Sequence, residues 1–113
     1  MQIRESRLGR ITILHIQGQA ILSAAPERLS QCVRDHLEAG DRLFVLNLAE
    51  CSKMDSTGLG ELVKAQRLIA DCEGVLKFAR VPPALRSLFI VTNLTELIES
   101  FDTEQAAINS FGA

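Results

Sequence analysis

The sequence contains neither tryptophan nor tyrosine, and its aromatic content is only 4%. Proteins that bind single-stranded nucleic acids stack bases on aromatic side chains, so the platforms for this mode of recognition are largely missing. Basic charge is also limited, since the sequence has 12 Lys and Arg residues against 14 Asp and Glu residues. The basic residues do not cluster into a stripe. Contact with a nucleic-acid backbone requires such a stripe. We therefore expect no DNA or RNA partner.

Long apolar runs are absent as well, and the amino terminus, residues 1–5, is of mixed polarity. A transmembrane helix needs about 18 apolar residues in succession, and a signal peptide needs an apolar central region. The sequence accordingly predicts a cytoplasmic protein with no membrane insertion.

The cysteines are an odd number and widely spaced, and we identify neither a CxxC pair nor a nearby histidine that would suggest zinc. We predict no disulfide, no metal site and no cofactor. Cys32, Cys51 and Cys72 are expected to be small buried hydrophobic residues, and His15 and His36 are given the same structural interpretation.

With 113 residues, 47% of them hydrophobic, the chain has the size and composition of one folded domain, assigned to residues 1–113 without a linker. Apolar periodicity predicts a hairpin of strands 3–8 and 11–17, followed by strands 43–48, 75–79 and 97–101. Helices are predicted from Pro26 to Gly40, from Asp55 to Gly74, from Pro82 to Asn93 and after Asp102, with residues 49–54 as a connection.

Residues 43–48 are apolar on both faces, which is typical of a central strand covered by helices on each side. A strand, a helix and a second strand follow one another over residues 43–79, which predicts a right-handed crossover and two parallel strands. The fold class is thus α/β, with a mixed sheet of about four to five strands packed against about four helices.

One segment carries candidate chemistry, namely residues 54–60, where a buried strand and its connection give way to a helix. Ser56 and Thr57 place two hydroxyls in the first helical turn, and Gly58 and Gly60 remove side chains that would hinder a partner. The simpler alternative is that Asp55 or Ser56 only caps the helix.

Enzymatic interpretations of this segment fail on their spacing. The run from Gly58 to Val63 lacks the third small residue of a dinucleotide fingerprint, and Met54 stands where a nucleophile elbow needs glycine. A phosphate-binding GxxxxGK[ST] loop is also absent from the sequence. We predict that the chain is not an enzyme and that its serine receives chemistry from another protein.

Residues 45–48 and Met54-Asp55-Ser56-Thr57-Gly58-Leu59-Gly60, together with the proline-started segment 81–89, resemble the STAS domain of bacterial anti-sigma factor antagonists. The resemblance covers nearly the whole chain. It implies that the unphosphorylated protein binds an anti-sigma factor that is also a serine kinase and thereby frees a sigma factor. Ser56 would be the phosphoacceptor, with Thr57 a weaker candidate, and a metal-dependent serine phosphatase would reverse the modification. The partner-binding residues implied are Gly18, Ile21, Asp55, Ser56, Thr57, Gly58, Leu59 and Gly60.

The chain departs from the family pattern after Gly18, where an aspartate is expected and Ile21 stands in its place. The apolar residues 20–25 either seal the first helix or form an adhesive patch for a divergent partner or a weak homodimer. A second function therefore stays open, that of a constitutive STAS scaffold or adaptor subunit in a stress-sensing or lipid-transport complex.

Overall fold

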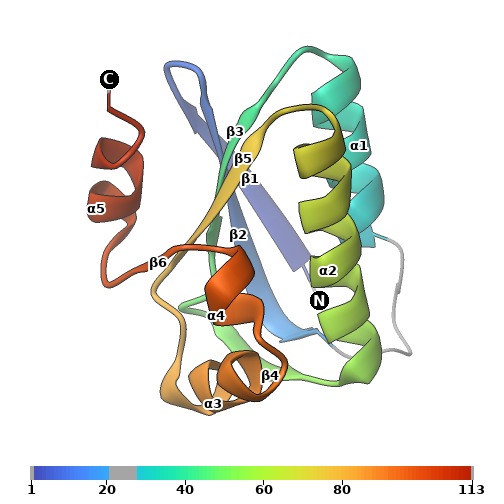
Figure 1. Cartoon of the computed structure of the whole chain (residues 1–113), viewed down its shortest axis with the longest axis vertical. Helices are drawn as coiled ribbons and strands as arrows, with labels where there is room; N and C mark the ends of the chain where they lie inside the picture. The colour runs from blue at the N-terminus through green and yellow to red at the C-terminus, as the bar shows by residue number, and fades with distance from the viewer. Residues whose placement is uncertain (1, 21–27, 113) are drawn as a thin grey trace.

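The computed structural model describes residues 2–20 and 28–112, which form one α/β domain (Figure 1). In chain order the elements are β1 (Gln2–Leu8), β2 (Ile11–Ala20), α1 (Arg28–Glu38), β3 (Leu43–Asn47), β4 (Cys51–Met54), α2 (Ser56–Asp71), β5 (Val75–Ala79), α3 (Pro83–Val91), α4 (Leu94–Leu97), β6 (Ser100–Phe101) and α5 (Glu104–Asn109). Over these described residues, six strands and five helices confirm the predicted fold class.

The sheet is mixed, with the strand order β1-β2-β3-β5-β6. The strands β1 and β2 form the predicted antiparallel hairpin around Gly9, while β3 pairs in parallel with both β2 and β5. The apolar segment at residues 43–47 is therefore a central strand, as its composition predicted.

Helices cover both faces of β3, which explains why its side chains are apolar on each side (Figure 1). Phe44 and Leu46 pack into the larger core beneath α1 and α2, whereas Val45 packs into a smaller core with residues of α5. All three are less than 2% exposed. Water is thus excluded from both faces of the strand, and burial of these side chains stabilises the fold by roughly 1.5–3 kcal/mol each.

Three short elements differ from the sequence prediction. Residues 51–54 form strand β4 and not a plain connection, residues 94–97 form the additional helix α4, and the last strand covers only residues 100–101. Each of these elements has four residues or fewer, which is too short for hydrophobic periodicity to distinguish it from a loop.

The end of α2 also differs from its prediction. The helix ends at Asp71, and Glu73, with φ +62°, takes the left-handed position that glycine usually fills. Gly74 is required for a different reason, because a Cβ atom there would lie 2.6 Å from the carbonyl oxygen of Arg42 and 2.9 Å from Cγ2 of Ile69. The glycine lets the chain leave the helix close to the start of β3.

The prediction that all three cysteines are buried is wrong for Cys72, which is exposed, and for Cys32, which is half-buried; only Cys51 lies in the core. The histidines are not core residues either. His15 Nε2 lies 3.1 Å from a carboxylate oxygen of Glu104, and His36 is half-buried beside two carboxylates.

Candidate functional site

The chain passes from β4 into α2 at Asp55, which is the N-cap of the helix. Oδ1 of Asp55 accepts a hydrogen bond from the amide of Gly58 at 2.8 Å, and its backbone carbonyl accepts one from the amide of Leu59 at 2.9 Å. The carboxylate also lies at the positive end of the helix dipole, where a negative charge is favourable. Of the two caps that the sequence allowed, the structure shows Asp55, and this leaves the side chain of Ser56 without a capping role in α2.

Ser56 is exposed in the first turn of α2, whereas its neighbour Thr57 is half-buried. The amides of these two residues precede the first intrahelical hydrogen bond, so they have no acceptor within the helix itself. Backbone N–H groups at the start of a helix can bind an anion, and a negatively charged group on Ser56 is therefore compatible with the fold. The serine is the more accessible of the two hydroxyl residues.

Leu59 and Gly60 differ in their surroundings. Leu59 is half-buried and packs against the larger core, which fixes the rotation of α2 about its axis. Gly60 is exposed, and a Cβ atom built on it would meet no atom within 4 Å. The first two turns of α2 thus expose Ser56 and Gly60, and no side chain projects from the surface at Gly60.

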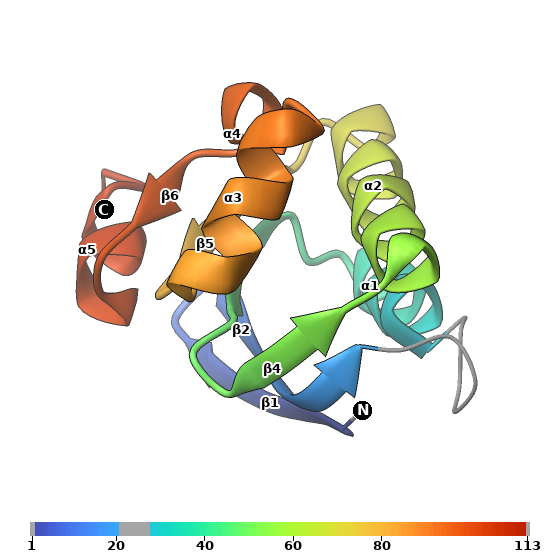
Figure 2. The same ribbon diagram turned by 90° about the horizontal axis from the view of Figure 1, so that it is seen from below.

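Strand β4 brings the end of β2 beside the residue that precedes Asp55, although Ala20 and Met54 are 34 positions apart in the sequence. Gly18 pairs with Cys51 and Ala20 pairs with Met54, the residue that immediately precedes the cap (Figure 2). The register shifts after Gly18, whose φ of +85° is strained for any other residue. The end of β2 therefore runs beside the start of α2, while Ile21, also predicted to contact a partner, lies outside the described residues.

Asn47 holds the turn that connects β3 to β4. Its Oδ1 accepts a hydrogen bond from the amide of Ala49 at 2.9 Å, and its Nδ2 donates one to Glu104 Oε1 at 2.9 Å. The amide of Gly18 then donates to the carbonyl of Glu50 at 2.9 Å. Because Asn47 is only 6% exposed, its bonds are shielded from water and set the direction in which β4 leaves the sheet.

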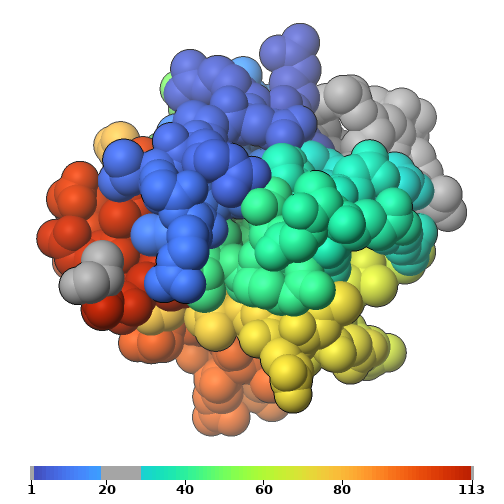
Figure 3. All heavy atoms as spheres, turned by 90° about the horizontal axis from the view of Figure 1, so that it is seen from above, coloured from blue at the N-terminus to red at the C-terminus, as the bar shows by residue number. Residues whose placement is uncertain are grey.

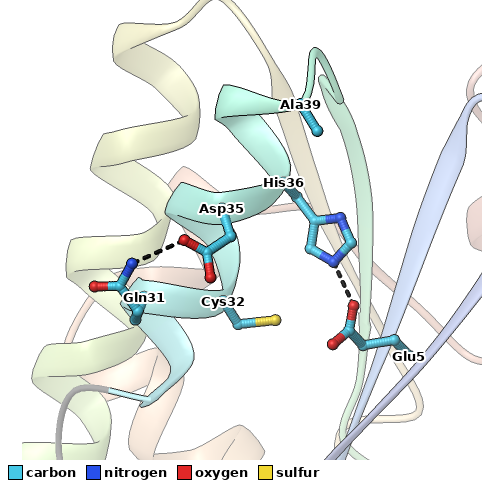
Figure 4. Close-up of a pocket in the computed structure, with 6 residues that line it drawn as sticks. All are labelled: Glu5, Gln31, Cys32, Asp35, His36 and Ala39. Carbon is cyan, nitrogen blue, oxygen red and sulfur yellow. Dashed lines mark hydrogen bonds and ion pairs between the residues drawn. The ribbon is translucent and has the colours of Figure 1, made fainter.

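A second group of polar side chains lies between β1 and α1, on the part of the molecule seen from above in Figure 3. A pocket of about 490 Å³ is lined there by Glu5, Gln31, Cys32, Asp35, His36 and Ala39 (Figure 4). Ligand atoms of Glu5, Cys32 and His36 all lie within 4.8 Å of one another. The sequence interpretation missed this group, although Cys32 and His36 are four residues apart and so share one face of a helix.

Charged neighbours of His36 stabilise its position in this second group. Arg7 donates a hydrogen bond to Asp41 at 2.7 Å and, with His36, lowers the pKa of Asp41 to about 2. Partial burial alone would lower the pKa of His36, but its hydrogen bonds and charge interactions with Asp41 and Glu5 outweigh burial and raise that pKa. The imidazole ring is thereby held between a carboxylate of β1 and one that follows α1.

Comparison with known protein families assigns the chain to one family. Residues 2–107 match the model of the STAS domain, so the protein belongs to the STAS domain family. This confirms the resemblance carried by residues 54–60. In the described residues, no helix is both long enough and apolar enough to span a membrane.

Several solved structures superpose closely on this fold. An anti-sigma factor antagonist from Mycobacterium paratuberculosis matches with a TM-score of 0.83 at 16% identity, over 96% of this chain and 92% of that one. The anti-sigma factor antagonist SpoIIAA in its unphosphorylated form matches with a TM-score of 0.77 at 20% identity, over 99% of this chain and 100% of that one. A sulfate transporter family protein from Wolinella succinogenes matches with a TM-score of 0.78 at 20% identity, over 89% of this chain and 84% of that one. At such identities the likeness extends to the fold alone.

Proposed function

We propose that this protein is a cytoplasmic anti-sigma factor antagonist controlled by phosphorylation of Ser56. Its unphosphorylated form binds an anti-sigma factor that is also a serine kinase, and this binding frees a sigma factor for transcription. The kinase transfers a phosphoryl group from its own ATP to Ser56, which ends the binding, and a metal-dependent serine phosphatase restores the active form. The protein itself performs no catalysis in this cycle.

The observation that carries the proposal is the exposure of Ser56 in the first turn of α2, beside a cap made by Asp55 alone. A kinase needs access to the hydroxyl, and an exposed first-turn position supplies it. The half-buried Thr57 is a poorer acceptor for the same reason. SpoIIAA, whose structure is also solved in a phosphorylated form, matches this fold with a TM-score of 0.76.

The effect of the phosphoryl group follows from its charge. It adds about −1.5 to −2 charges next to the carboxylate of Asp55. At the helix N-terminus free amides and the dipole compensate this charge, so the domain remains folded. Against a partner surface that lacks matching cations, the charge must be desolvated and meets repulsion. A loss of 1.4 kcal/mol weakens binding about tenfold, so a modest penalty is sufficient for a switch.

The partner contacts the surface formed by residues 55–60, in which Ser56 and Gly60 are exposed, and the end of β2 from Gly18 to Ala20. These segments lie side by side because β4 pairs with β2 directly before the cap. Gly18 and Gly60 have no side chain to hinder the approach of the kinase.

The test combines a phosphorylation assay with binding measurements. The purified chain is incubated with candidate anti-sigma factor kinases and ATP, and its intact mass is determined. We expect one added phosphate that is lost in Ser56→Ala and kept in Thr57→Val, the matched control for the neighbouring hydroxyl. In binding assays Ser56→Ala should match the unmodified protein, and Ser56→Asp should bind at least tenfold more weakly. Equal affinities of the Ser56→Ala and Ser56→Asp variants would contradict the switch.

A second function, that of a constitutive scaffold or adaptor subunit, is favoured by one observation. Gly18 is followed by Gln19, Ala20 and Ile21 where an aspartate was expected, so the sequence after Gln19 begins with an apolar segment. A scaffold would take up no phosphate from any of these kinases and would remain in its complex whatever residue stands at position 56. The same two assays therefore separate the two functions.

A further inference from the structure

The pocket between β1 and α1 brings together three side chains whose donor atoms are a thiol, an imidazole and a carboxylate. They are Cys32 and His36 of α1 and Glu5 of β1, and their ligand atoms lie within 4.8 Å of one another. We propose that these residues bind a divalent transition-metal ion of the chemical class of Zn²⁺. The site lies apart from α2, and the inference goes beyond the proposed function and does not depend on it.

The secondary structure places the three ligands. Cys32 and His36 are four residues apart in α1, so both project from the same face of the helix, toward β1 (Figure 4). Glu5 lies on β1 across the pocket, with Oε1 2.5 Å from Nε2 of His36. Two ligands thus come from one rigid helix and the third from the neighbouring strand, the usual way in which a metal links two elements.

His36 already has the outer partner that metal-binding histidines require. Its Nδ1 lies 2.9 Å from Oδ2 of Asp41. The end of α1 dictates this contact, because Gly40, with φ +101°, turns the chain so that the amide of Asp41 donates to the carbonyl of His36 at 3.0 Å. Histidines that bind a metal nearly always donate their other ring N–H to a carboxylate, a backbone carbonyl or water, which fixes the tautomer and the orientation of the ring. A metal ion would bind Nε2, the atom that now donates a hydrogen bond to Glu5, once that nitrogen has lost its proton.

A metal ion fits with small side-chain movements. Bonds of about 2.0–2.3 Å in a tetrahedral site put neighbouring ligand atoms roughly 3.3–3.8 Å apart. The ligand atoms of Glu5, Cys32 and His36 lie within 4.8 Å of one another, so shifts of about 1 Å bring them to that spacing. The side chain of Glu5 is 51% exposed and can adjust, and the pocket opens to solvent, so water takes the fourth position.

The donor set identifies the class of metal. Mg²⁺ and Ca²⁺ take oxygen ligands, whereas thiolate and imidazole select Zn²⁺ and related transition metals. Binding replaces the hydrogen bond between Nε2 of His36 and Glu5 with two metal–ligand bonds, and it releases two protons to solvent, the one in that hydrogen bond and the thiol proton of Cys32. The ion would hold β1, an edge strand whose side chains are mostly exposed, against α1.

The experiment titrates the full-length, reduced protein with Co²⁺, a spectroscopic substitute for Zn²⁺, and then displaces it with Zn²⁺. We expect a near-ultraviolet charge-transfer band from a cobalt–thiolate bond, saturating at one ion per chain. Zn²⁺ should raise the melting temperature, and a chelator should reverse that rise. Cys32→Ser should abolish the band and lower the Zn²⁺ affinity at least tenfold.

Cys72→Ser is the matched control, because Cys72 is the exposed cysteine at the end of α2. It should keep the band and an affinity within twofold of the unmodified chain. Glu5→Gln changes an exposed side chain and tests the site independently if Cys32→Ser fails to fold; it should weaken Zn²⁺ binding several-fold. Absence of the band, a band unchanged in Cys32→Ser, a band lost in Cys72→Ser, or unchanged Zn²⁺ affinity in Glu5→Gln would each overturn the proposal.

Discussion

Replacing Gly60 and, separately, Gly74 with alanine adds the same methyl group in two very different surroundings. At Gly60, inside α2, the new Cβ atom meets no atom within 4 Å. At Gly74 it lies 2.6 Å from the carbonyl oxygen of Arg42 and 2.9 Å from Cγ2 of Ile69. The two substitutions are therefore expected to change the free energy of unfolding in opposite directions.

The gain at Gly60 comes from the unfolded chain and from helix propensity. Alanine is favoured over glycine within a helix by roughly 0.5–1 kcal/mol, and nothing around Gly60 offsets this. For a domain of this size the gain corresponds to a rise of roughly 2–6 °C in melting temperature.

The loss at Gly74 comes from overlap with the backbone. The oxygen of Arg42 that the methyl group would touch also accepts the amide of Val75 at 2.8 Å, at the start of the pairing between β3 and β5. Relief of the overlap must therefore move a paired strand and not the flexible end of a side chain. Overpacking of this kind typically costs about 1–3 kcal/mol.

Urea denaturation followed by far-ultraviolet circular dichroism measures both effects, since the chain has no tryptophan or tyrosine for fluorescence. The free energies of unfolding of the two variants should differ by about 1.5–4 kcal/mol, with the unmodified protein between them. A destabilised Gly60→Ala variant would refute the open space assigned to that position. A Gly74→Ala variant as stable as the unmodified chain would refute the close approach to Arg42.

Two further predictions concern the residues that position the serine segment. Asp55→Ala removes the helix cap and should lower the free energy of unfolding by about 1 kcal/mol. Asp55→Asn keeps an acceptor for the Gly58 amide, so its free energy of unfolding should stay within a few tenths of a kcal/mol of the unmodified protein. Equal losses for the two variants in urea denaturation would show that the charge of Asp55, and not its capping hydrogen bond, stabilises the helix. Asn47→Ala leaves the amide of Ala49 without its buried acceptor and should cost about 1–3 kcal/mol by the same measurement. Glu104→Gln retains an acceptor oxygen for Asn47 Nδ2 and should cost less than about 1 kcal/mol, so a larger loss in that variant than in Asn47→Ala would contradict the bonding described.

The Gly60 prediction also bears on function. A glycine with open space around it, in the second turn of a helix, makes the folded domain less stable than alanine would. Within the described residues the packing gives no reason for it. The proposed docking of a kinase does, since a methyl group there would stand between the two surfaces. Loss of partner affinity in a Gly60→Ala variant of raised stability would connect the glycine to binding.

The sequence by itself determined the elements whose residues form long local patterns. The apolar run at 43–48 predicted a strand covered on both faces, and the spacing of Leu62 and Ile69 placed one face of α2 in the core, where both are buried. The serine segment was identifiable for the same reason, since its cap, hydroxyl and glycine residues are consecutive. Such elements can be predicted without knowing their neighbours in the fold, because backbone geometry sets the spacing of side chains and the hydrophobic effect decides which side chains are buried.

Only the tertiary structure decided which distant segments meet. Strand β4 is defined by its pairing with the end of β2, and this pairing alone puts Gly18 beside Cys51 and Ala20 beside Met54, just before the start of α2. Gly74 is needed because Arg42 lies next to it, and Glu5 joins Cys32 and His36 only because the hairpin packs against α1. These contacts depend on chain segments about 30 residues apart, whose juxtaposition is set by the packing of the whole sheet and not by any local preference.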